Sequence, residues 1–143
     1  MENEINQLEE DVTLNTESKQ KIYSKKAIWG FSVIFTSIFG GVLLFQNLKD
    51  IGKKKEANLI LLYSILYTIV TIYLVNIPDK PKSGISFMCN MVGGYILSEY
   101  FFNKYFLNPD DYDKKKIWKP LIISILIIIP FIFVLIYSGT LDK

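Results

Sequence analysis

The sequence predicts an all-α membrane protein with four transmembrane helices arranged as two helical hairpins. Half of the 143 residues are hydrophobic, long stretches contain no Lys, Arg, Asp or Glu, and lysines gather between those stretches. A helix needs about 20 apolar residues to cross a hydrocarbon layer about 30 Å thick. The uncharged stretches cover residues 27–48, 57–77, 83–98 and 120–141. Because a soluble core of this size does not need such runs, we expect a lipid bilayer to surround most of the chain.

Residues 1–24 form a polar, acidic N-terminal tail, and residues 25–143 form the single transmembrane domain. Within the tail, Ile5, Leu8 and Val12 have helical spacing. This pattern allows a short amphipathic helix that docks on a partner, or a solvated tail that frays. We favour the solvated tail because the apolar stripe is so short.

The first hairpin joins predicted spans at residues 27–48 and 57–77 through the loop "KDIGKKKE", in which Gly52 can end a helix. The second hairpin joins spans at 84–107 and 120–138. Glu99 interrupts the third span, but apolar residues resume after it. The fourth span starts at Pro120, which suits the first turn of a helix.

The two hairpins resemble each other when Gly40 is placed on Gly93. "IFGGVLL" then matches "MVGGYIL", and a further shift of eight residues brings the two lysine triplets together. Apolar sequences align easily by chance, so a tandem repeat and a chance likeness both stay open. A true repeat would be a parallel one, because two crossings restore the direction of the chain.

The lysine distribution does not predict the orientation of four full spans in the membrane, since seven lysines flank one side and nine flank the other. The alternative is a first segment that enters and leaves by the same face, bending at Gly40 and Gly41. Thirteen lysines then share one side and three the other. We favour four spans, because small residues at every fourth position suit close helix packing within a bilayer. The predicted helix-packing residues are Ser32, Thr36, Gly40, Gly41, Ser86, Gly93, Gly94 and Ser98.

Glu99 and Asn90 are the candidates for a polar site within the membrane. Glu99 is the one acidic residue embedded in an apolar run, where an ionisable group costs about 2.5–3.5 kcal/mol on insertion scales. It could carry a proton or a cation. It could equally lie near the helix end and reach lipid headgroups or Lys104. Hydrogen bonding between helices is the plainer account of Asn90.

No catalytic, cofactor-binding or metal-binding constellation can be found in the sequence. The chain has no His, and Cys89 has no base near it in sequence. Asp110, Asp111 and Asp113 lack the spacing of a calcium loop, so we expect a solvated turn. The net charge of +2 is too small to indicate a nucleic-acid partner.

The run "KIYSKKAIWGFSVIFTSIFGGVLLFQNLKDIGKKKEA" resembles the opening of a family of small bacterial multispan membrane proteins with no assigned activity. Their common features are an "IYS" stretch, a glycine pair, an asparagine and a basic loop. Many members follow the glycine pair with proline, where this chain has Val42. The resemblance implies a bacterial cytoplasmic (inner) membrane and transfers no functional residue.

These observations favour a multi-pass membrane protein that is not an enzyme and binds no cofactor. We expect it to act through helix association, as a homo-oligomer, as a subunit with another membrane protein, or as an immunity-type protector against a toxin. The alternative is a small ion- or proton-coupled channel or carrier that uses Glu99.

Overall fold

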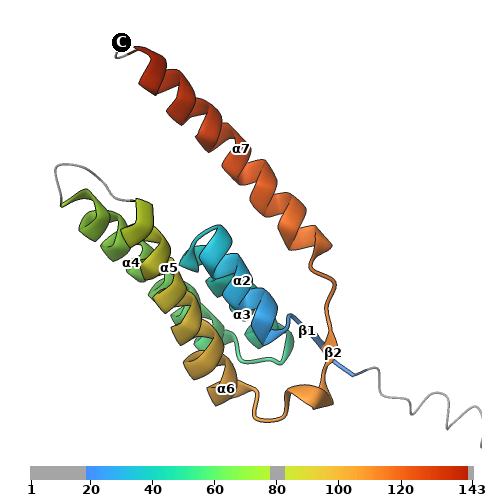
Figure 1. The fold of residues 1–143 in the computed structure, drawn as a ribbon. Coiled ribbons are helices and arrows are strands. Elements are labelled where there is room, and N and C mark those ends of the chain that lie inside the picture. The colour runs from blue at the N-terminus through green and yellow to red at the C-terminus, as the bar shows by residue number, and fades with distance from the viewer. Residues whose placement is uncertain (1–18, 78–82, 142–143) are drawn as a thin grey trace, which may run out of the picture.

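The computed structural model describes residues 19–77 and 83–141, which are almost entirely helical (Figure 1). The predicted all-α class is confirmed, with one short pair of strands added. In chain order the elements are β1 (Lys21–Ile22), α2 (Lys25–Ile34), α3 (Ser37–Asp50), α4 (Lys54–Asn76), α5 (Ser83–Tyr95), the π-helix η1 (Ile96–Phe101), α6 (Phe102–Tyr105), the 3₁₀ turn η2 (Pro109–Asp111), β2 (Asp113–Lys114) and α7 (Trp118–Leu141). The helix considered for the acidic tail lies outside the described residues.

The first apolar segment is not one helix, so the prediction of a continuous span over residues 27–48 is wrong. Helix α2 ends at Ile34, and Thr36, in an extended conformation, caps the start of α3. With 10 and 14 residues, α2 and α3 are only about 15 and 21 Å long. The segment instead folds back on itself, as the rejected alternative required.

The bend lies at Phe35 and Thr36, not at the glycine pair. Neither residue needs a positive φ, and Thr36 occupies the N-cap position of α3 without a side-chain capping hydrogen bond. Gly40 and Gly41 lie inside α3, where their missing side chains allow close packing. A Cβ atom on Gly40 would come within 2.7 Å of the Ile28 carbonyl oxygen, and one on Gly41 would collide with the Ser64 side chain. The glycines therefore bring α3 against α2 and α4.

Helices α3 and α4 form the predicted hairpin, and Gly52 ends α3 as expected. Its φ of 80° is the left-handed conformation that glycine adopts most easily. The Gly52 and Lys53 amides donate to the carbonyls of Lys49 and Leu48, which satisfies the end of the helix. Helix α4 then runs along α3, with Ala57, Ile60 and Ser64 buried.

The third predicted span is one continuous helical stretch, Ser83–Tyr105, that widens into a π-helix at Ile96–Phe101. It packs against α2 and α4. A Cβ atom on Gly94 would lie 2.7 Å from the Ser32 Cβ atom, and one on Gly93 would lie 2.5 Å from the Tyr67 ring. Ser32 is thus enclosed between Gly40 on α3 and Gly94 on α5.

Helix α7 extends away from the other helices in Figure 1. Leu121 packs against the core and Ser124 is buried, whereas Leu126 and Phe133 are 63% and 73% exposed. Within residues 19–77 and 83–141, one helix, α4, is long and apolar enough by length and composition to cross a membrane. The structure thus supplies one such helix where the sequence predicted four.

Both halves of the chain pass from a helix with a glycine pair, through a lysine-rich loop, to an apolar helix. Their packing differs, because α4 lies along α3 whereas α7 diverges from the α5–α6 stretch (Figure 1). The question of a tandem repeat stays open.

The glycine contact at α2 generates the first prediction. We expect Gly40→Ala to lower the free energy of unfolding by about 1–3 kcal/mol, because the Ile28 carbonyl is backbone and cannot move aside. Gly30→Ala is the matched control on α2. Nothing lies within 4 Å of its new methyl group, so stability should stay the same or rise by about 0.5–1 kcal/mol. Thermal unfolding followed by circular dichroism measures both, and equal losses would contradict the packing account.

Candidate functional site: a lysine-rich end with two clefts

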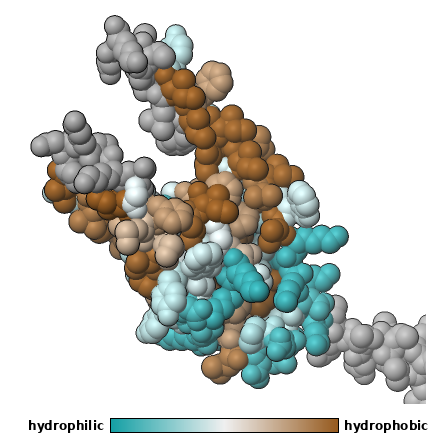
Figure 2. All heavy atoms as spheres, in the orientation of Figure 1, coloured by the Kyte–Doolittle hydropathy of each residue, from teal (hydrophilic) through white to brown (hydrophobic). Residues whose placement is uncertain are grey.

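The hydrophilic residues gather at one end of the molecule, while apolar side chains cover the helices that lead away from it (Figure 2). The start of α2, the end of α3, the start of α4 and the loop from α6 to α7 all meet at this end (Figure 1). These segments carry the lysines that lie on one side if the first apolar segment enters and leaves by the same face. We call this region the lysine-rich end.

A buried asparagine holds the N-terminal segment in place. The Tyr23 amide donates to Asn47 Oδ1 over 2.7 Å, and Asn47 Nδ2 donates to the Tyr23 carbonyl over 2.8 Å. Asn47 has no solvent exposure, so both backbone groups of Tyr23 are satisfied away from water. These two hydrogen bonds, which we call the Asn47 clamp, hold the end of α3 against the segment that precedes α2.

The strands β1 and β2 tie the segment before α2 to the loop before α7. They are parallel, with Lys21 opposite Asp113 and Ile22 opposite Lys114. The Lys115 amide donates to the Ile22 carbonyl over 2.7 Å, and the Lys115 ammonium forms an ion pair with Asp50. The loop from α6 to α7 is therefore anchored on the segment that precedes α2.

Glu99 lies at this lysine-rich end, on the π-helix η1. Lys25 Nζ donates to Glu99 Oε2 over 2.6 Å, and Asn103 Nδ2 donates to the same oxygen over 3.2 Å. The two side chains of the ion pair are 37% and 40% exposed. The partner of Glu99 is thus Lys25, not Lys104, and both side chains remain partly exposed.

Asn90 lies apart from Glu99, half-buried on α5. No hydrogen bond joins its side chain to another described residue, so the expected interhelical bond is not seen. A hydrogen bond does join α4 to α5, but it comes from Tyr67, whose hydroxyl donates to the Cys89 carbonyl over 2.8 Å. Asn90 and Glu99 do not form one site.

The predicted packing residues fall into two groups. Ser32, Gly40, Gly41, Gly93, Gly94 and Ser98 are buried, and all but Ser98 supply the close contacts described above. Thr36 and Ser86 are only partly buried, and Thr36 serves as the cap of α3. The stripes therefore pack helices of this chain against one another.

The three aspartates of the α6–α7 loop lie in an exposed turn and strand, as expected from their spacing. Asp110 and Asp111 belong to η2, and Asp113 begins β2. In the described part of the chain, no group of three or more His, Cys, Asp or Glu is placed to hold a metal ion.

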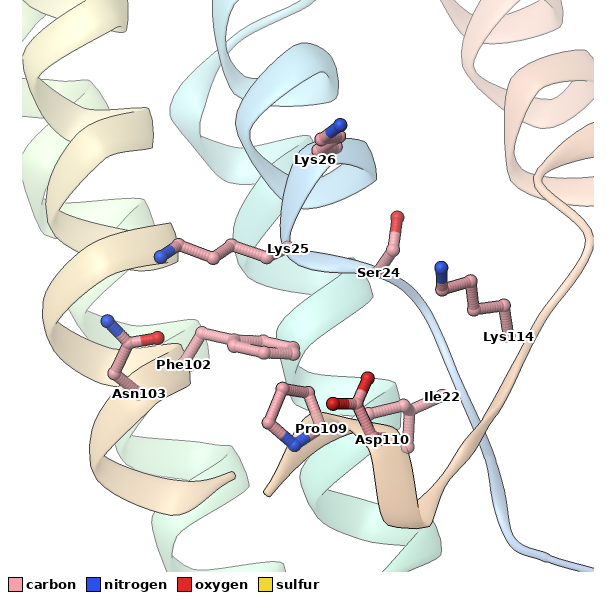
Figure 3. A pocket seen from close by; sticks show the side chains of 9 residues that line it. All are labelled: Ile22, Ser24, Lys25, Lys26, Phe102, Asn103, Pro109, Asp110 and Lys114. Atoms are coloured by element: carbon pink, nitrogen blue, oxygen red, sulfur yellow. The ribbon is translucent and has the colours of Figure 1, made fainter. Parts of the chain in front are cut away.

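Two clefts open at the lysine-rich end. The first, of about 360 Å³, lies between the start of α2, α6 and the η2–β2 loop (Figure 3). Ser24, Lys25, Lys26, Asn103, Asp110 and Lys114 provide its polar lining. The second, of about 690 Å³, runs between α2 and the α5–η1 stretch and is lined by Lys25, Lys26, Trp29, Gly30, Tyr95, Ser98 and Glu99. Because Lys25 and Lys26 line both, we call the first the cationic cleft and the second the adjoining groove.

The comparisons with known proteins identify no relative: no family model, no curated protein and no solved structure matches this chain.

Sequence reasoning did not find the Asn47 clamp or the cationic cleft. A signal for the clamp was present, since Asn47 is an isolated amide near the end of an apolar segment, where a buried amide needs partners. No local pattern could have found the cleft. It brings together residues near Ser24 and Lys114, which are distant in sequence and are joined by the β1–β2 pairing.

The clamp generates the second prediction. We expect Asn47→Leu to lower the free energy of unfolding by about 1–3 kcal/mol, because it leaves the buried amide and carbonyl of Tyr23 without partners. Hydrogen exchange at the Tyr23 and Lys115 amides should also accelerate as β1 separates from β2. Gln46→Leu is the matched control, one residue earlier on α3. Unchanged exchange in Asn47→Leu would show that β1 is held by other contacts.

Proposed function

We propose that this chain is an integral membrane protein that crosses the bilayer three times and carries α2–α3 as a hairpin that enters and leaves by one face. The observation that carries the proposal is the separation of exposed apolar side chains from the lysine-rich end (Figure 2). Leu66, Ile69 and Tyr73 on α4 are 53%, 56% and 72% exposed, and α7 is exposed to a similar degree. Monomeric soluble proteins rarely expose contiguous apolar surfaces of this kind.

The lengths of the helices support three crossings. Helices α4 and α7, with 23 and 24 residues, extend about 35 Å, enough for a hydrocarbon layer of about 30 Å. The Ser83–Tyr105 stretch is the third crossing. Helices α2 and α3 are too short to cross, so we propose that they enter the layer from the lysine-rich side and turn back at Phe35 and Thr36.

The hydroxyl groups on α4 also suit a medium without water. Ser64, Thr68 and Thr71 each donate to a carbonyl of the same helix, over 2.8–2.9 Å. A hydroxyl bonded in this way leaves little unsatisfied polarity on a helix that faces lipid.

The three-crossing arrangement also orients the chain. In this arrangement thirteen of the sixteen lysines lie on one side of the membrane: before α2 or in its first turn, and in or beside the α3–α4 and α6–α7 loops. Lysines near membrane-spanning segments are retained on the cytoplasmic side. We therefore propose that the lysine-rich end faces the cytoplasm of a bacterial cell.

We propose that the protein is noncatalytic and acts through helix association. Helix α7 presents exposed apolar side chains along most of its length, although its first turns pack on the core. Such a helix can pack against a second copy of the chain or against another membrane protein, as in a complex subunit or an immunity-type protector. The absence of His from the sequence removes the usual general base and metal ligand.

The channel or carrier alternative has less support. It required Glu99 to lie on a polar path, together with Asn90. Glu99 instead pairs with Lys25 at the lysine-rich end, and Asn90 lies apart from it.

Cysteine accessibility tests the proposed topology. Single cysteines replace Lys19, Lys54, Lys82 or Asp113 in a Cys89→Ser background, and a membrane-impermeant maleimide is added to intact cells and to inverted vesicles. We expect Lys19, Lys54 and Asp113 positions to react from the cytoplasmic side and the Lys82 position from the opposite side. Labelling of Lys19 and Lys54 positions from opposite sides would restore four crossings. Recovery of the folded protein in a detergent-free supernatant would refute the membrane proposal itself.

Ion flux separates the proposal from its alternative. We expect purified protein in liposomes to conduct no protons or monovalent cations above empty liposomes, and Glu99→Gln to change nothing, because Glu99 is engaged by Lys25. A pH-sensitive dye inside the liposomes reports proton entry. Flux that Glu99→Gln abolishes, while Asp111→Asn leaves it intact, would establish the carrier instead.

A further inference from the structure

The cationic cleft contains more positive than negative side chains. Lys25, Lys26 and Lys114 line it, opposed by the single carboxylate of Asp110. Lys25 already pairs with Glu99. Lys26 and Lys114 form no ion pair within the described part of the chain, and Figure 3 shows them on either side of Ser24. With Lys25 neutralised by Glu99, two ammonium groups and one carboxylate remain in the cleft. The excess positive charge favours an anionic ligand.

Phosphate oxygens suit these donors well. An ammonium group acts as a point charge toward phosphate, and charge-assisted hydrogen bonds are about twice as strong as neutral ones. Ser24 adds a hydroxyl at the start of α2: its oxygen accepts from the Ala27 amide, which leaves its proton available to a ligand. Asp110 would repel a phosphate, so we expect the phosphate to lie toward Lys26 and Lys114 rather than toward η2.

The adjoining groove continues from the same lysines onto an apolar surface. Its walls include the rings of Trp29 and Tyr95, and Gly30 of α2 also lines it. A Cβ atom on Gly30 would meet nothing within 4 Å. The one carboxylate that lines the groove, Glu99, is neutralised by Lys25. A ligand that fills both clefts would thus have an anionic head and an apolar chain.

We infer that the cationic cleft binds the phosphate group of an anionic phospholipid, with an acyl chain lying in the adjoining groove over Gly30. The inference rests on the proposed membrane location, which puts the lysine-rich end at the headgroup level. Trp and Tyr side chains such as Trp29 and Tyr95 are enriched at that level. Inorganic phosphate has the same anionic oxygens as the headgroup but no chain to occupy the groove. A change in the groove should therefore affect lipid binding and not phosphate binding.

The test uses the full-length protein, extracted from membranes and delipidated in a neutral detergent. Bound lipid is counted by native mass spectrometry during titration with phosphatidylglycerol or with phosphatidylcholine of the same acyl chains. Each lysine near an anionic headgroup contributes about fivefold in affinity. We therefore expect Lys26→Gln/Lys114→Gln to weaken phosphatidylglycerol binding by roughly 25-fold. Phosphatidylcholine binding should weaken far less, because the choline cation already offsets the charge of its phosphate.

Two further variants locate the site. Lys54→Gln/Lys55→Gln removes the same charge from the same end but lies outside both clefts, and it should keep nearly full affinity. Gly30→Leu adds an apolar side chain to the groove at a position where a Cβ atom meets nothing within 4 Å. It should weaken phosphatidylglycerol binding by about tenfold, while competition by inorganic phosphate stays the same. Circular dichroism confirms that each variant is folded.

Three results would overturn the inference. Equal losses in both double-lysine variants would indicate general attraction to the lysine-rich end. Unchanged lipid binding in Gly30→Leu, with phosphate binding lost in Lys26→Gln/Lys114→Gln, would indicate a free phosphate site. Equal affinity for the two lipids would remove the anionic preference. The proposed membrane location fails separately, if the protein is recovered without detergent from the supernatant.

Discussion

The architecture depends on the close approach of three helices around Ser32. Ser32 has no solvent exposure and lies between Gly40 of α3 and Gly94 of α5. Its hydroxyl donates to the Ile28 carbonyl of its own helix over 2.9 Å, so the crowded contact contains no unsatisfied group on this residue. Only glycine leaves enough room at Gly40 and Gly94 for helix backbones to come this near. A side chain at either position would force α2 to shift relative to α3 or α5.

This packing determines where the charges lie. Once α2 and α3 fold together, the residues before α2 and those after α3 return to the same end of the molecule. Asn47 then reaches Tyr23, Asp50 reaches Lys115, and the short β1–β2 pairing brings the α6–α7 loop to the start of α2. Both clefts form because these segments come together. Their walls are supplied by α2, by the α5–α6 stretch and, in the cationic cleft, by the loop between α6 and α7. A straight first segment would have separated these groups by the length of a helix.

The sequence and the structure agree where the controlling forces are local. Long apolar segments form helices with nearly the expected limits at residues 57–77, 84–107 and 120–138. Gly52 ends α3 because its left-handed conformation is a property of glycine itself. Among the small residues predicted to pack helices together, the two glycine pairs lie in close contacts, whereas Thr36 and Ser86 are only partly buried. The partner of Glu99 was missed, since Lys25 is 74 residues away in the chain and no local spacing links the two.

The sequence by itself determined that the chain is helical and which of its surfaces are apolar, because both follow from residue type and from periodicity along the chain. Only the tertiary structure decided that residues 27–48 form two helices. The same apolar composition is compatible with one straight helix or with a folded pair, and the choice depends on contacts with segments far away in sequence. Ser32 must meet Gly94, and Asn47 must meet Tyr23, before the bend at Thr36 is favourable. The lysine-rich end and its clefts follow from that choice.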